Sequence, residues 1–223
     1  FRASLSTYLQ GQVAESLFKS LAVDAYKAHA LSSYNLYCAE QVEALRLPAT
    51  FQAVSLDTPF FSGAIHSPYK QPVGARLALG ALSVAYGLSK FALPSYNPTG
   101  ASATVHSSGQ VAVKLVGLPA GGLLPVRRTI GFEILGASGF WMGAPILRTE
   151  GDTVILGSCP SGAKALRYLW YNCPCTTTPF RCPLYTAVPA IGKLSGELSS
   201  IPVGPFVLTT LNTSVTERTR AAP

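Results

Sequence analysis

The sequence predicts an α/β segment followed by a β-rich sandwich or barrel domain. In residues 1–94, helical patterns flank one short apolar strand, as in a parallel sheet that helices cover on both faces. After Gly87, glycine and proline separate short apolar runs, which is typical of a β-sandwich or barrel. We therefore divide the chain into the α/β segment, a β-rich domain over residues 95–206 and a polar tail over residues 207–223.

The elements of the α/β segment follow from local patterns. Residues 14–30 and 38–47 predict helices, and Pro48 ends the second. Residues 51–57 read FQAVSLD and predict a strand. Residues 70–86 predict a further helix.

One side of that last helix is expected to face the sheet. The residues that the helical period places on this buried side are Val73, Leu77, Ala81 and Val84. Gly74 and Gly80 lower helix propensity, so we expect both to permit close packing against the sheet.

The β-rich domain is predicted from apolar runs at residues 111–115, 130–134 and 152–156, with no helical period between them. Trp141 and Trp170 fall in this domain. Each is interpreted either as a core aromatic residue of the sandwich or as a ring that stacks on a sugar.

Composition excludes some classes of function. Hydrophobic residues make up 48% and charged residues 12% of the chain, as expected of a folded protein. The net charge is +7, but the basic residues are scattered, so no nucleic-acid partner is expected. The longest apolar run is shorter than the ~20 residues of a membrane span, so none is expected.

Several features suggest an oxidising compartment and a longer protein. Four of the five cysteines fall between Cys159 and Cys182, and Asn212-Thr213-Ser214 is a glycosylation sequon. We therefore expect the protein to be secreted or lysosomal. The chain begins at Phe1 with no initiator methionine, so we expect it to be a fragment, a processed subunit or part of a longer protein.

His66 is the candidate catalytic residue. It lies in a loop beyond the carboxyl end of the predicted strand, where α/β folds place catalytic groups. Asp57 ends that strand and is the nearest carboxylate upstream. A carboxylate that holds one ring nitrogen leaves the other to act as a base toward a serine. The alternative is a structural histidine, with Asp57 closing the strand or capping the loop.

Four blocks of the sequence together resemble one enzyme family. Residues 65–77 read IHSPYKQPVGARL and resemble the block around the catalytic histidine of the sialate O-acetylesterases, which have an SGNH-type esterase fold. Residues 40–50 (EQVEALRLPAT) are similar to the preceding helix of that family. Residues 165–170 (ALRYLW) and 182–185 (CPLY) resemble two blocks farther on.

The resemblance implies a fold, an activity and partners. The fold would be the C-terminal part of an SGNH-like, flavodoxin-like three-layer hydrolase domain, followed by the β-sandwich domain. His66 would be the general base, with Asp57 as its candidate acid. The substrate would be an O-acetylated sugar or sialic acid, and no cofactor or metal is implied.

The family's nucleophilic serine is expected upstream. Its Gly-Gln-Ser motif is not matched by Gly11-Gln12, which Val13 follows. The partner would therefore be an upstream portion of the same protein or a companion subunit. The alternative is a non-catalytic structural or carbohydrate-binding relative within a larger assembly.

The cysteines have two interpretations. The short separation of Cys175 and Cys182, the prolines beside them and the family resemblance predict a disulfide between them. Cys159 and Cys173 would form a possible second bridge. The alternative is a zinc site, although the Cys-x-Cys spacing differs from the usual Cys-x-x-Cys pairs.

Overall fold

The computed structural model describes much of the β-rich domain and part of the α/β segment. The described residues are 47–59, 67–91, 101–118, 122–170, 175, 178–187 and 200–213. They form helix α3 (Lys70–Val84), the 3-10 helix η3 (Ser89–Phe91), and the strands β1 (Ser102–Val105), β2 (Val111–Lys114), β3 (Phe132–Leu135), β4 (Trp141–Ala144), β5 (Ile146–Glu150), β6 (Thr153–Leu156), β7 (Ala165–Tyr168), β8 (Tyr185–Ala187), β9 (Ser200–Pro202), β10 (Phe206–Leu208) and β11 (Asn212–Thr213). The helices predicted over residues 14–30 and 38–47 lie outside these ranges, apart from the last residue of the second.

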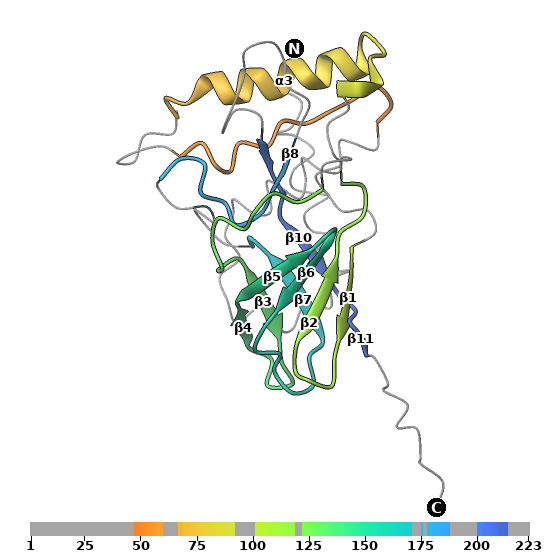
Figure 1. The fold of residues 1–223 in the computed structure, drawn as a ribbon, viewed down its shortest axis with the longest axis vertical. Helices are drawn as coiled ribbons and strands as arrows, with labels where there is room; N and C mark the ends of the chain where they lie inside the picture. Colours follow the sequence, from red (N-terminus) through yellow and green to blue (C-terminus); the bar gives the residue numbers. More distant parts are fainter. Residues whose placement is uncertain are drawn as a thin grey trace, which may run out of the picture.

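Two sheets form the sandwich-like body of the molecule (Figure 1). The 5-stranded sheet has the order β11-β1-β2-β6-β5, and the 4-stranded sheet has the order β10-β7-β3-β4. Their strand pairs are antiparallel except for β1 and β11. The predicted sandwich-like β architecture is thus confirmed, with β2, β3 and β6 at the three apolar runs. The SGNH-like three-layer part stays a prediction.

The core of the sandwich comes from alternate residues of facing strands. Val111 of β2 and Phe132 of β3 are buried, whereas the residues that follow them on the strands are less so. This period of two is expected where one face of a strand packs on a core. The ring of Tyr168 lies 4.6 Å from that of Phe132 and 5.5 Å from that of Phe206, measured between centroids.

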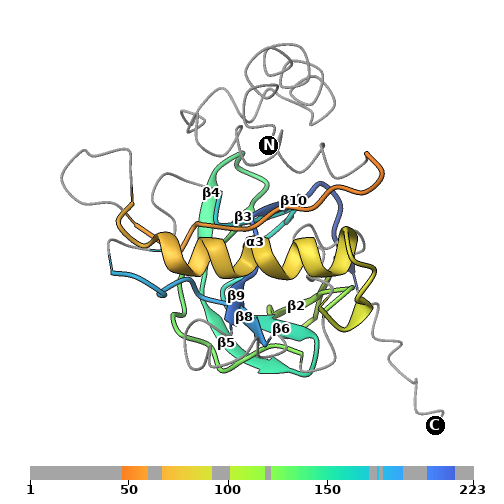
Figure 2. The same cartoon turned by 90° about the horizontal axis from the view of Figure 1, so that it is seen from above.

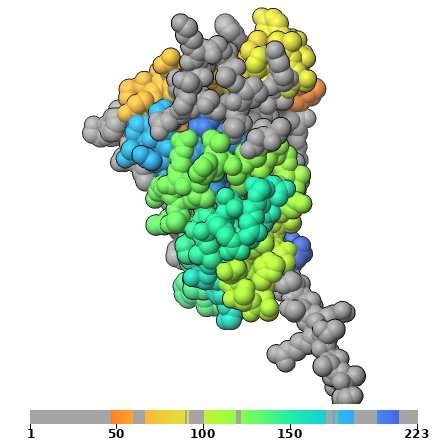
Figure 3. Space-filling model, viewed as in Figure 1, coloured from red at the N-terminus to blue at the C-terminus, as the bar shows by residue number. Residues whose placement is uncertain are grey.

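Helix α3 lies across one end of the sandwich, beside the small sheet of β8 and β9 (Figures 1 and 2). In the space-filling view, orange and yellow residues from this part of the chain are visible at the end of the molecule above the green and teal sandwich (Figure 3). A side-chain contact joins the helix to this sheet, since Arg76 Nη2 donates a hydrogen bond to the backbone oxygen of Ser200 at 3.4 Å.

The strand predicted at residues 51–57 is not a strand in this structure. No described segment pairs with it as a neighbouring strand. The pattern FQAVSLD is apolar enough for a buried strand, but a strand also needs a partner for its N–H and C=O groups. The backbone oxygens of Val54 and Asp57 are instead used in contacts with Arg76 and Phe180.

The buried face of α3 differs from the predicted one. The helix buries Pro72, Arg76, Leu79 and Gly80, whereas Leu77, expected on the buried side, is 46% exposed. Apolar side chains surround most of this helix, so their period does not select one face. The face is fixed by Arg76, whose charge is buried against a carboxylate.

The chain after residue 206 is not only a polar tail. Residues 206–208 form β10 at the edge of the 4-stranded sheet, and residues 212–213 form β11 beside β1. β10 has three residues and β11 has two, so neither strand is long enough to show a period of two in the sequence.

Gly80 is expected to be required for the packing of α3. A Cβ placed there would overlap the ring of Phe51. Alanine improves helix propensity by about 1 kcal/mol, but overpacking costs about 1–3 kcal/mol. We expect Gly80→Ala to lower the free energy of unfolding of the full-length protein by up to about 2 kcal/mol, as measured by urea denaturation.

Gly74 provides the matched control on the same helix. A Cβ at Gly74 has no atom within 4 Å, so the close packing expected of this residue is absent among the described residues. Gly74→Ala should therefore raise stability by about 0.5–1 kcal/mol. An equal effect of both substitutions would contradict the packing argument. A loss at Gly74 would show that another part of the protein packs on that side of the helix.

Candidate functional site

The candidate catalytic residue His66 lies outside the described residues. The structure does describe both flanks of its segment, residues 47–59 before it and residues 67–91 after it. The two flanks meet in a group of residues around the buried Asp57 carboxylate, which we call the Asp57 cluster. Its members are Asp57, Arg76, Arg127, Phe180 and Tyr185.

An ion pair between Asp57 and Arg76 is the centre of this cluster. Both residues are 1% exposed. Arg76 donates from Nη1 to Oδ1 at 2.7 Å and from Nη2 to Oδ2 at 2.8 Å. Its Nη1 also donates to the backbone oxygen of Val54 at 2.6 Å. Because Asp57 precedes His66 and Arg76 follows it, this pair joins the two flanks of the histidine-bearing segment.

Tyr185 adds a third donor to the same carboxylate. Its hydroxyl donates to Asp57 Oδ2 at 3.1 Å and accepts a hydrogen bond from the Cys182 N–H at 3.1 Å. Burial, followed by the neighbouring Asp57 charge, raises the pKa of Tyr185 well above its usual value. The phenol therefore stays protonated and remains a donor to Asp57 throughout the physiological pH range.

Arg127 holds the outer side of the cluster. Its guanidinium lies 3.7 Å from the centroid of the Tyr185 ring, which is a cation–π contact. It also donates to the backbone oxygen of Phe180 at 3.0 Å and to Ser200 Oγ at 3.1 Å. Arg127 thus links β8, β9 and the loop that carries Phe180.

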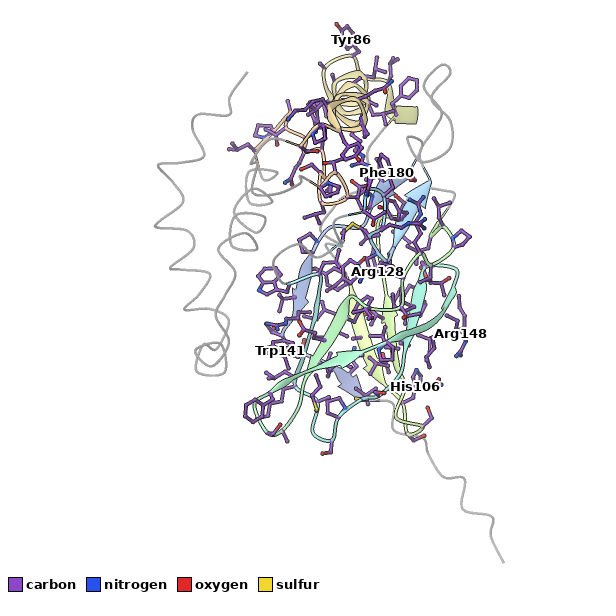
Figure 4. The ribbon with its side chains drawn as sticks, turned by 90° about the vertical axis from the view of Figure 1, so that its left-hand side faces the viewer. Tyr86, His106, Arg128, Trp141, Arg148 and Phe180 are labelled. Carbon is purple, nitrogen blue, oxygen red and sulfur yellow. A yellow bond between two sulfur atoms is a disulfide. The ribbon has the colours of Figure 1, made fainter. Side chains whose placement is uncertain are left out.

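Phe180 contacts both flanks of the histidine-bearing segment. Its N–H donates to the backbone oxygen of Asp57 at 2.9 Å. Its ring meets that of Tyr69 edge-on, with 6.3 Å between centroids. Phe180 has φ 58°, a left-handed conformation that is uncommon for bulky side chains, and its two backbone hydrogen bonds hold it there. In Figure 4 it lies between α3 and the sandwich.

The loop that carries Phe180 is closed by the disulfide between Cys175 and Cys182 that the sequence analysis expected. These two cysteines are therefore not a zinc-binding pair. Cys159 is a free thiol, and Cys173, its possible partner in a second bridge, lies outside the described residues. Burial raises the pKa of the Cys159 thiol.

Sequence reasoning selected Asp57 but missed its partners. Arg76 and Tyr185 both lie inside the blocks that carry the family resemblance, yet no local pattern connects them. An arginine on an otherwise apolar helix was the available signal, because a buried guanidinium requires a carboxylate or several carbonyl partners. The contact of Asp57 with His66 is not tested.

The two tryptophans do not form an open platform for a sugar. Trp141 is 9% and Trp170 is 8% exposed, and both belong to a small apolar cluster of buried residues. The guanidinium of Arg167 lies 4.2 Å from the Trp141 ring centroid, and its Nε donates to Glu133 Oε2 at 2.7 Å. Their interpretation as core aromatic residues is the one that the observed burial favours.

Other predicted features can be placed more briefly. Asn212 is exposed in β11 at the edge of the 5-stranded sheet. Within the described ranges, no group of three or more His, Cys, Asp or Glu side chains is arranged to bind a metal ion. No helix in the same ranges is both long and apolar enough to cross a membrane.

The chain is similar to known acetylesterases in sequence and in structure, although no family model matches it. It is 32% identical over 174 residues to the sialate O-acetylesterase of Homo sapiens, an alignment that covers 73% of this chain and 29% of that protein. The sialate O-acetylesterase of Mus musculus is 29% identical over 182 residues, covering 73% of this chain and 28% of the relative.

A solved structure gives a corresponding match. The crystal structure of a carbohydrate acetylesterase from Xanthomonas citri superposes with a TM-score of 0.58 at 31% identity, covering 79% of this chain and 36% of that chain. The present chain thus spans less than a third of the length of the two curated relatives.

Proposed function

We propose that this chain, a distant relative of the sialate O-acetylesterases, is the C-terminal part of a carbohydrate esterase that hydrolyses O-acetyl esters of sugars. The observation that carries the proposal is the similarity to acetylesterases in both sequence and structure over more than 70% of the chain. The substrate class is an O-acetylated sugar or sialic acid.

The proposed chemistry assigns the base to His66. A serine hydroxyl, supplied by a part of the protein outside these 223 residues, attacks the acetyl carbonyl while His66 accepts its proton. His66 then returns this proton to the departing sugar oxygen, which leaves an acetyl-serine. Water activated by His66 cleaves the acetyl-serine and releases acetate. None of these steps requires a metal or a cofactor.

Asp57 is the proposed acid behind His66. Its carboxylate already accepts three hydrogen bonds, two from Arg76 and one from Tyr185. A carboxylate offers about four acceptor positions, so one position on Oδ1 is left for an imidazole N–H. A bond there would fix the histidine tautomer and leave the second ring nitrogen to act as the base.

The exposed side of α3 supports the proposal that a further polypeptide segment packs against this helix. Leu77 and Ala78 are exposed there, and Tyr86 is exposed just beyond the helix. A helix with apolar residues on all sides is usually buried. We propose that an upstream portion of the same protein, or a companion subunit, covers this side and brings the serine to His66.

We also propose that the protein is secreted or lysosomal. The Cys175–Cys182 disulfide is of a kind that persists in oxidising compartments. The exposed position of Asn212 is compatible with glycosylation of its sequon.

The full-length protein tests the proposed function. We expect it to release acetate from O-acetylated sialic acid or from an O-acetylated neutral sugar, and to lose this activity on treatment with a serine-directed phosphonate. A correctly folded full-length protein that releases no acetate from either substrate would overturn the proposal. It would favour the structural or carbohydrate-binding relative instead.

A further inference from the structure

We propose that Tyr185 and Phe180 are positioning residues for the reaction, which act on His66 through Asp57, its proposed acid, and through Tyr69. This inference rests on the proposed esterase function. Both residues lie in or beside the loop closed by the Cys175–Cys182 disulfide. The β-rich domain would thus serve the reaction without contributing a group that touches the substrate.

Tyr185 and Phe180 contact residues on both described flanks of the histidine-bearing segment, Asp57 before it and Tyr69 after it. At the N-terminal end, Tyr185 donates to the Asp57 carboxylate and Phe180 donates to the Asp57 backbone oxygen. At the C-terminal end, the Phe180 ring packs edge-on against Tyr69. The Asp57–Arg76 pair then ties the first end to α3. Phe180 thus contacts Asp57, which precedes His66 in the sequence, and Tyr69, which follows it.

Tyr185 and Phe180 are themselves held by contacts with Cys182 and Arg127. Tyr185 accepts the Cys182 N–H, so the phenol is bound between the disulfide and Asp57. Arg127 binds the Phe180 backbone oxygen and stacks on the Tyr185 ring. In Figure 4, Phe180 is seen at the junction between α3 and the sandwich. Arg127 therefore links Phe180 of the loop to Tyr185 of β8.

Positioning of this kind has a known kinetic signature. Displacement of a catalytic group by about 1 Å can lower the rate on the order of 100-fold. Substrate binding depends on other contacts, so the effect is expected in kcat and not in KM. This distinction separates positioning from a general loss of folded protein, which lowers the active concentration and changes neither constant per active site.

Tyr185→Phe in the full-length protein is the principal test. We expect kcat for an O-acetylated sugar to fall about 10- to 100-fold, with KM changed by less than about threefold. Active sites are counted by titration with a serine-directed phosphonate, so that misfolded molecules do not enter the rate.

Tyr168→Phe is the matched control. Tyr168 is as fully buried as Tyr185, and its hydroxyl also accepts a backbone N–H, that of Leu184 at 3.2 Å. Both substitutions leave one buried N–H without its acceptor, and Tyr185→Phe also removes a donor from the Asp57 carboxylate, so it should lower the melting temperature more than Tyr168→Phe does. Only Tyr185 is bonded to Asp57, and Tyr168→Phe should keep the wild-type kcat.

Phe180→Leu is a second variant that tests the same inference if Tyr185→Phe does not fold. It preserves the backbone bond to Asp57 and removes the ring contact with Tyr69, so a smaller fall in kcat, about threefold to tenfold, is expected. If the wild-type protein is active but the folded variants match Tyr168→Phe in kcat, the positioning inference is wrong. If the wild-type protein shows no esterase activity, the proposed function itself fails.

Discussion

His66→Ala in the full-length protein is expected to lower kcat for O-acetyl ester hydrolysis by about 10⁴-fold or more. Without an imidazole, no group accepts the serine proton as the acetyl carbonyl is attacked, and none protonates the sugar oxygen as it leaves. The measurement is acetate release under saturating substrate. Circular dichroism and the melting temperature should show an unchanged fold.

His106→Ala is the control for this substitution. His106 follows β1, and Figure 4 shows it near the end of the sandwich opposite to Phe180. Its backbone bonds to Gln110 and Gly109 do not involve the imidazole. The variant should therefore hydrolyse the ester at the wild-type rate. A His66→Ala protein with near wild-type activity would remove His66 from the mechanism.

The sandwich could be predicted from sequence because its signals are local. Buried and less buried residues alternate along β2, whereas β3 and β6 are mostly buried apolar runs, and glycine or proline marks the turns between the three runs. These patterns are set by neighbouring residues in the sequence and need no knowledge of the rest of the fold. The disulfide was predictable for a similar reason, since only a short loop separates its cysteines.

The Asp57 cluster could be predicted only in part. Asp57 and Tyr185 are 128 residues apart in the sequence, and no periodicity relates positions that far apart. The buried face of α3 was also predicted wrongly, because a helical pattern assigns an arginine to the solvent side, whereas Arg76 is buried. A bidentate ion pair reverses that preference, and the helix turns Arg76 inward with Leu79 and Gly80.

The predicted strand at residues 51–57 shows a different limit. The prediction that its apolar residues are buried is correct for Val54 and Leu56. Burial alone does not make a strand, because the strand is defined by pairing with another strand. The described part of the chain provides no such neighbour for this segment.

Arg76→Met in the full-length protein is expected to lower the free energy of unfolding by about 3–5 kcal/mol. Methionine fills a similar volume but leaves the Asp57 carboxylate, which is 1% exposed, with Tyr185 as its remaining side-chain donor. An uncompensated buried charge is more costly than the loss of the attraction itself. The measurement is the shift of the urea denaturation midpoint, with the slope of the free energy of unfolding against urea concentration unchanged.

Arg148→Met is the control for burial of the ion pair. Arg148 Nε binds Glu150 Oε1 at 2.6 Å, but both side chains are about half exposed, at 51% and 56%. Loss of that pair should cost less than about 1 kcal/mol because water solvates the remaining carboxylate. The double variant Asp57→Asn with Arg76→Met removes both charges and should recover much of the stability lost in Arg76→Met. If Arg76→Met costs no more than Arg148→Met, the Asp57–Arg76 pair does not join the two flanks of the histidine-bearing segment as the structure indicates.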